Sequence, residues 1–293
     1  MISVPSLTLT YGNGFFILCG QQVYYETERE GESIKNIIGH IEENFFAVCR
    51  YWGSLNTSFK KDDAIEAMST GVPVSDVNWA FNEKPLNHNS LQHITAVKEY
   101  YRTLNLRFWW WVYPRAQAPA TGAMLQEAGL YLFTKVPCMA ATLNDSLLHH
   151  DVSEHIKILP VRNREDLLIW TDISFEGFEM PARARKSYGD FVASFDLDSL
   201  SPLKLFLACL DEKPVATSLL FTHQDTAGIY YVSTLPAYRN RGCGLSVTKA
   251  AMRSAKAAGF NEVILQATPM GERIYKRTGF KEYCQAEIYK LRK

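Results

Sequence analysis

The chain lacks an excess of either charge, with 31 lysine and arginine residues against 31 aspartate and glutamate residues. Because such a protein has no basic field, we expect no nucleic-acid partner. The chain also lacks any apolar run close to the ~20 residues that a membrane span needs, and no charged segment precedes an apolar stretch at its start. These absences predict a cytoplasmic protein with no membrane partner.

Closely spaced cysteines are missing as well. The sequence has six cysteines and no C-x-x-C pair: Cys19, Cys49, Cys138, Cys209, Cys243 and Cys284. Zinc sites and dithiol redox motifs usually show such short spacings, so we expect reduced, buried thiols and no metal.

The length of 293 residues is about twice that of a typical domain of ~150 residues. The most polar stretch near the middle, Leu143 to Glu154, has the composition of a linker. The sequence therefore predicts two domains, residues 1–150 and residues 151–293.

The most informative segment is Arg239 to Gly244, with the sequence RNRGCG. It follows a strand-like run, Gly228 to Thr234, and precedes a run with helical spacing, Leu245 to Ala258. Its glycines therefore stand at a helix N-terminus, where unpaired backbone N–H groups and the helix dipole can bind a diphosphate. An ordinary turn is the alternative. A P-loop would need Gly-Lys-Ser/Thr, and a dinucleotide fingerprint would need a third glycine where Val247 stands.

The second half of the chain has further periodic runs around this loop. They predict a strand at 156–161, helices at 163–175 and 183–195, a hairpin over 205–222, a strand at 262–268, a short helix at 272–278 and a last strand at 283–291.

Two motifs in this order resemble the GNAT superfamily of N-acetyltransferases. Arg239 to Gly244 matches the family's coenzyme A loop, Q/R-x-x-G-x-G/A. The later family motif, N-x-x-A-x-x-L-Y-x-x-x-G-F, corresponds here to Thr268, Gly271, Ile274, Tyr275, Gly279 and Phe280. Thr268 replaces the usual Asn, and Gly271 replaces the usual Ala.

The resemblance implies an α/β fold with a mixed sheet, and acetyl-CoA as the co-substrate of a direct transfer to a primary amine. It places the coenzyme at Val232, Ser233, Thr234, Arg239, Asn240, Arg241, Gly242, Cys243, Gly244, Leu245 and Thr268. It also assigns Tyr275 as the acid that protonates the departing thiolate, a role that suits a phenol with an ordinary pKa of about 10.

The general base stays open, because no Asp or Glu lies between Gly228 and Thr234, where many members of the superfamily have one. Glu176 and Glu179 are candidates, with Phe178 beside them, because the family's acceptor site borders that segment. His223 or a chain of waters are the alternatives. A small-molecule or peptide amine is the expected acceptor. A non-catalytic acyl-CoA sensor and an enzyme for longer acyl donors are the competing hypotheses.

The first half of the chain repeats the later series of elements faintly. A helix over 91–104, a strand over 107–112, a short helix from Met124 and a final strand over 131–143 follow the same order. The segment 82–90 has no glycine, and Leu125 stands where Tyr275 does. The sequence therefore predicts a tandem GNAT form with a degenerate, non-catalytic first domain.

Overall fold

The computed structural model describes residues 22–61, 65–148 and 155–292. The helices are α1 (Gln22–Leu55), α2 (Leu91–Thr103), α3 (Pro119–Glu127), α4 (Asp145–Leu148), α5 (Arg164–Gly177), α6 (Arg185–Ala193), α7 (Cys243–Ala257) and α8 (Pro269–Arg277). The strands are β1 (Thr57–Lys61), β2 (Ile65–Ser69), β3 (Trp79–Asn82), β4 (Trp109–Val112), β5 (Leu130–Thr142), β6 (Ile156–Pro160), β7 (Leu203–Leu210), β8 (Lys213–His223), β9 (Thr226–Thr234), β10 (Glu262–Gln266) and β11 (Lys281–Leu291).

The strands form one continuous mixed sheet in the order β1-β2-β3-β4-β11-β5-β10-β9-β8-β7-β6. Two pairs, β3 with β4 and β9 with β10, are parallel, and the other pairs are antiparallel. The α/β fold with a mixed sheet is confirmed.

The two halves of the chain exchange their last strands. β5, which ends the first half, pairs with β10 and β11 of the second half, and β11 pairs with β4 of the first half. Each half thus needs the other to complete its part of the sheet. The boundary at residue 150 stays a prediction, because it falls among residues 149–154, outside the described residues.

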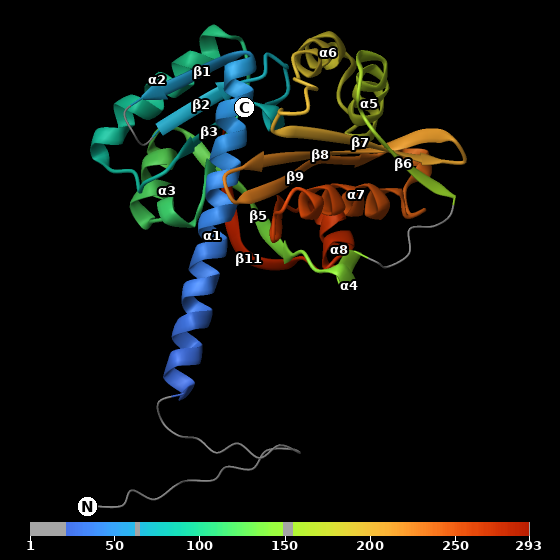
Figure 1. Ribbon diagram of the computed structural model, residues 1–293. Coiled ribbons are helices and arrows are strands. Elements are labelled where there is room, and N and C mark those ends of the chain that lie inside the picture. Colours follow the sequence, from blue (N-terminus) through green and yellow to red (C-terminus); the bar gives the residue numbers. More distant parts are fainter. Residues whose placement is uncertain (1–21, 62–64, 149–154, 293) are drawn as a thin grey trace, which may run out of the picture.

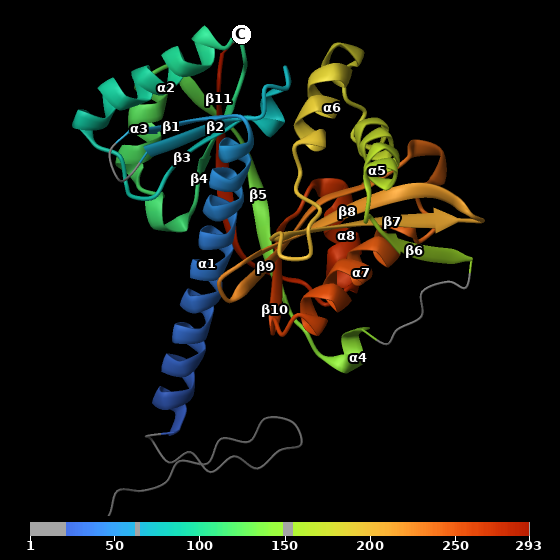
Figure 2. The ribbon, with the colours of Figure 1, turned by 45° about the horizontal axis from the view of Figure 1, so that its top comes forward.

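Helices cover both faces of this sheet (Figure 1). α1, α5 and α6 contribute to one apolar cluster that spans both halves of the chain. On the other face α2 and α3 cover the first half, and α7 and α8 cover the second. In Figure 1 and Figure 2, α1 crosses the junction of the halves, and its first turns extend beyond the body of the protein.

A buried asparagine fixes α1 to the central strand β9. The Asn44 amide donates to the carbonyl and hydroxyl of Thr226, and Asn44 Oδ1 accepts from the Tyr230 hydroxyl at 2.8 Å. A Cβ built on Gly228 would lie 2.1 Å from Asn44 Oδ1, so β9 needs a glycine beneath the helix. A satisfied buried amide of this kind favours a single docking position for α1.

The local predictions in the second half hold. The predicted helix after the glycine-rich loop is α7, and Gly259 follows it with φ +92°, a left-handed C-terminal cap. Asn163 caps α5 by accepting from the Asp166 N–H. The hairpin is β7 and β8, with Asp211 and Glu212 at positive φ in its turn.

In the first half, α2, β4, α3 and β5 follow the order of α7, β10, α8 and β11, as the repeat predicts. The sequence reasoning missed α1, although it is 34 residues long. No helix of the described residues is long and apolar enough to cross a membrane.

Candidate active site

The two parallel central strands separate toward their C-terminal ends. β9 and β10 pair only at Ala227 with Val263 and at Gly228 with Ile264. Beyond these pairs β9 continues to Thr234 and β10 to Gln266, with no further register between them in the described chain. The main-chain groups of two diverging strands can accept an extended ligand as an additional strand.

A β-bulge lies on β9 where the strands diverge. Thr217 faces Ser233 but Leu219 faces Tyr230, so Tyr231 and Val232 together oppose one residue of β8. Tyr231 has a φ of +50°, a left-handed conformation that costs about 1–3 kcal/mol for a residue with a side chain. The Thr217 hydroxyl supports it by bonding the Tyr231 carbonyl and the Ser233 hydroxyl, at 3.0 and 2.8 Å. Bulges redirect backbone groups, and this one includes Val232, one of the predicted coenzyme-binding residues.

The predicted diphosphate loop leads directly into α7. Gly242 is the N-cap residue with φ +86°, and Asn240 also has a positive φ of 63°. The first internal bond of the helix runs from the Ser246 N–H to the Gly242 carbonyl, at 2.9 Å, and no side chain caps the helix. The N–H groups of Cys243, Gly244 and Leu245 therefore precede the first helical bond, as at the start of any α-helix. These amides can donate to an anion, and the positive end of the helix dipole favours it.

Side chains around these amides are arranged to leave the loop open. Asn240, Arg241 and Gly242 are exposed, whereas the Cys243 side chain is buried. Burial raises the pKa of the Cys243 thiol, so it stays protonated at neutral pH and is a poor nucleophile.

Arg239 connects the loop with the segment that follows α5. Its guanidinium donates to the Thr234 carbonyl and to the Gly177 carbonyl, at 3.2 and 2.9 Å, and forms an ion pair with Glu179 at 2.9 Å. These contacts place Arg239 in a structural role. A contact between Arg239 and a phosphate stays a prediction.

The residues of the second motif shape α8. The Thr268 hydroxyl accepts from the Gly271 N–H at 3.2 Å and so caps the N-terminus of the helix. Thr can therefore replace the family's usual Asn, because both side chains are N-cap residues. A Cβ on Gly271 would lie only 2.6 Å from Tyr275 Cε2, which explains why glycine stands here in place of the family's usual Ala. The Tyr275 ring is buried and packs on Phe280, and burial raises the pKa of its phenol well above the ordinary value. The phenol is thus protonated at neutral pH, as a proton donor must be.

The comparisons with known proteins agree with this geometry. Residues 155–277 match the family model described as the acetyltransferase (GNAT) domain. This part of the chain is a GNAT domain. No curated protein sequence matches the chain.

Solved structures extend the likeness to the first half. A GCN5-related N-acetyltransferase from Kribbella flavida has a TM-score of 0.67 at 17% identity, over 85% of this chain and 95% of that one. A GCN5-related N-acetyltransferase from Sphaerobacter thermophilus reaches 0.58 at 17% identity, over 78% and 76%. A tandem GNAT protein from the clavulanic acid biosynthesis pathway reaches 0.52 at 13% identity, over 78% of each chain. The tandem GNAT fold is therefore confirmed.

Next to the GNAT domain's bulge lies the predicted acceptor segment. Phe178 is 40% exposed and meets the Tyr231 ring edge-on, with the centroids 5.8 Å apart. Glu179 pairs with Arg239, and Glu176 forms an ion pair with Arg185 at 3.7 Å. Phe178 and Glu179 thus lie beside the donor loop and the central strand, whereas the Glu176 carboxylate is turned to a neighbouring arginine.

A carboxylate of the first half, which the sequence reasoning missed, lies close enough to Tyr231 to act on its phenol electrostatically. Asp76 lies in a short 3-10 helix, Ser75–Val77, and its carbonyl accepts from the Trp79 indole N–H at 2.8 Å. Trp79 touches Trp52 of α1, and Trp52 touches the Tyr231 ring, with centroid distances of 5.2 and 5.5 Å.

The same carboxylate acts electrostatically on the GNAT domain. Burial raises the pKa of the Tyr231 phenol, and the nearby Tyr188 and the charge of Asp76 raise it further. Partial desolvation of the carboxylate by surrounding protein also raises the pKa of Asp76 itself, although the residue is exposed to solvent. No local signal in the sequence identifies Asp76, because only the packing of the two halves brings it near Tyr231.

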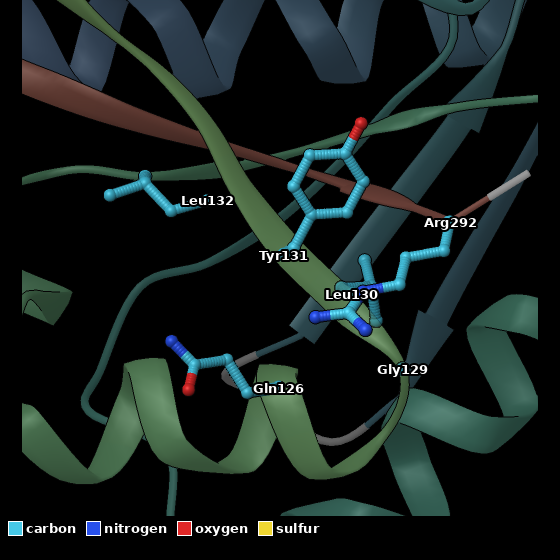
Figure 3. Close-up of a pocket in the computed structure, with 6 residues that line it drawn as sticks. All are labelled: Gln126, Gly129, Leu130, Tyr131, Leu132 and Arg292. Atoms are coloured by element: carbon cyan, nitrogen blue, oxygen red, sulfur yellow. The ribbon is translucent and has the colours of Figure 1, made fainter.

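One hollow lies apart from these residues. This hollow of about 460 Å³ beside α3 and β5 is lined by Gln126, Gly129, Leu130, Tyr131, Leu132 and Arg292 (Figure 3). It contains none of the predicted site residues.

Within the described residues, no group of three or more His, Cys, Asp or Glu side chains is arranged to bind a metal ion.

Proposed function

We propose that the protein is an acetyl-CoA-dependent N-acetyltransferase that transfers the acetyl group directly to a primary amine. The supporting observation is the pairing of two features within a GNAT domain: free amides at the start of α7, and central strands that separate beside them. Diphosphate on the amides of Cys243, Gly244 and Leu245 would orient the rest of the donor toward the gap between β9 and β10. Bound acetyl-CoA would supply the thioester-activated acetyl group.

The residues of the chain have distinct roles in this proposal. A backbone N–H at the Val232 bulge would donate to the thioester oxygen, and the loss of such a donor typically costs about 10²–10³-fold in rate. Tyr275 holds the proton that the departing thiolate takes up. Its raised pKa keeps the phenol protonated at neutral pH, so the proton is present when the thiolate forms.

Asp76 is our candidate for the acceptor side. A carboxylate with a raised pKa is a better base at neutral pH than an ordinary one, and its charge also attracts an ammonium group. The Tyr231 ring lies between the buried Trp52 and the partly exposed Phe178, with centroid distances of 5.5 and 5.8 Å. These side chains suit a small-molecule or peptide amine with an apolar part, acting in the cytoplasm.

The test is release of free thiol from acetyl-CoA by the purified full chain, measured with a panel of small amines and peptides. The enzyme hypothesis predicts saturable release that depends on the amine, with the mass of the amine raised by one acetyl group. The sensor hypothesis predicts saturable coenzyme A binding without release under any amine. Repeating the assay with longer acyl-CoA donors decides between acetyl and longer acyl transfer.

A further inference from the structure

The two exchanged strands, β5 and β11, bring two cysteines directly opposite each other. Cys138 of β5 and Cys284 of β11 are register partners, 146 positions apart in the sequence. An irregularity between Glu282 and Cys284 sets this register, because the pairing shifts there by one residue. The thiols thus meet at the seam where the last strands of the two halves join.

Their geometry is suitable for a covalent link. Directly opposed residues in an antiparallel pair have Cα atoms about 4.5–5.5 Å apart, and disulfide-linked residues have them about 4.4–6.8 Å apart. Both side chains face the apolar cluster beneath α1, Cys138 fully buried within it and Cys284 partly buried against it. The two thiols are within hydrogen-bonding reach of each other.

Further contacts, from β5 itself, from β11 and from Tyr113, surround the Cys138 thiol. Its Sγ lies 3.6 Å from the Val136 carbonyl, and the Ala286 N–H and the Tyr113 hydroxyl are close to it. The Tyr113 hydroxyl is fully enclosed and has no regular hydrogen-bond partner. A side chain held from several directions needs little reorganisation to form a new bond with its neighbour.

We propose that Cys138 and Cys284 are a redox-active thiol pair that closes to an intrachain disulfide between β5 and β11. The oxidant is a small-molecule disulfide such as glutathione disulfide. The partly exposed Cys284 loses its proton and attacks one sulfur of the oxidant, which forms a mixed disulfide and releases one glutathione thiol. Cys138 then loses its proton and attacks the Cys284 sulfur, which releases the second glutathione thiol. The protein is oxidised by two electrons, and the small disulfide is reduced to two thiols.

The order of these steps follows from exposure. Burial raises the pKa of the Cys138 thiol, so this thiol stays protonated and out of reach of an external oxidant. Once Cys284 carries the glutathione group, its sulfur lies beside Cys138, and the second step is intramolecular. The closed disulfide would join the end strand of one half to the end strand of the other, and so resist their separation.

The proposal does not depend on enzymatic activity, and the test uses the reduced full chain. The chain is incubated with glutathione disulfide, free thiols are alkylated after unfolding, and peptides are mapped by mass spectrometry. We expect a Cys138 peptide joined to a Cys284 peptide, and reductant should separate them. A free Cys138, a Cys284 that keeps its glutathione group, or a link to another cysteine would overturn the proposal.

Thermal unfolding provides an independent measurement. Oxidation should raise the melting temperature of the wild type, and the variants Cys138→Ala and Cys284→Ala should show no such rise. The matched control is Cys209→Ala, a buried cysteine of β7 that faces Lys157 and Pro214 and no cysteine. The control should respond to oxidation as the wild type does. If Cys138→Ala does not fold, Cys284→Ala and the peptide map still decide the question, and a rise in Cys284→Ala contradicts the proposal.

Discussion

Replacing Gly244 by valine separates ligand binding by the α7 amides from stability of the fold. A Cβ at this position would lie 3.4 Å from Thr234 Oγ1 and 3.7 Å from Ile274 Cδ1, which are ordinary contact distances. The backbone there has no positive φ, so valine needs no strained conformation. We therefore expect the Gly244→Val variant to fold with a melting temperature close to that of the wild type.

Coenzyme A binding should respond very differently. The valine methyl groups would stand over the first turn of α7 and keep a diphosphate from at least one backbone N–H. Losing one hydrogen bond to a charged group costs about 1.5–3 kcal/mol. At about 1.4 kcal/mol for each factor of ten, Kd should rise about 10- to 150-fold.

Isothermal titration calorimetry with coenzyme A measures this change. The control is Gly189→Val in α6, where an added Cβ would meet nothing within 4 Å and no predicted ligand is near. The control should bind coenzyme A as the wild type does. A folded Gly244→Val variant with unchanged Kd, or an equal loss in the control, would refute the assignment of the diphosphate to these amides.

The remaining predictions concern catalysis and stability. Tyr275→Phe should lower kcat about 10²-fold and leave the Kd of coenzyme A nearly unchanged, and a full kcat would remove the phenol from the reaction. Asp76→Asn should lower kcat/KM for the amine about 10-fold or more with coenzyme A binding intact. Because partial desolvation raises the pKa of Asp76 in the folded state, its ionised form opposes folding. Solvent screens this effect at an exposed residue, so the Asn variant should melt only slightly higher than the wild type at pH 7. This gain should disappear below about pH 4, where the wild-type carboxyl is protonated in the unfolded chain too. Gly228→Ala should lower the free energy of unfolding by about 1–3 kcal/mol, because the new Cβ would lie 2.1 Å from Asn44 Oδ1, whereas Gly39→Ala, in open space, should not.

The glycine-rich turn before α7, and α8, could be predicted because their signals are local. Gly242 at an αL position, the helix that begins at Cys243 and the Thr268 cap each depend on residues within a few positions of one another. The phenol of Tyr275 follows from the same short motif. Such short-range patterns can be recognised in a sequence without knowing how the rest of the chain packs.

The strand exchange could not be predicted, because strand periodicity does not specify a partner. Neither β5 nor β11 has a regular alternation of buried and exposed residues that would identify its neighbours in the sheet. The position of Asp76 depends on this assembly and on α1, whose Trp52 lies between the two halves. The pairing of Cys138 with Cys284 also results from the strand exchange. The spacing of the cysteines in the sequence therefore could not predict it.

A crystal structure of the protein with coenzyme A tests the central claim most directly. We predict the diphosphate within hydrogen-bonding distance of the N–H groups of Cys243, Gly244 and Leu245, and the pantetheine arm between β9 and β10. A coenzyme bound elsewhere, or crystals that take up none at saturating concentration while the loop is open to solvent, would contradict it.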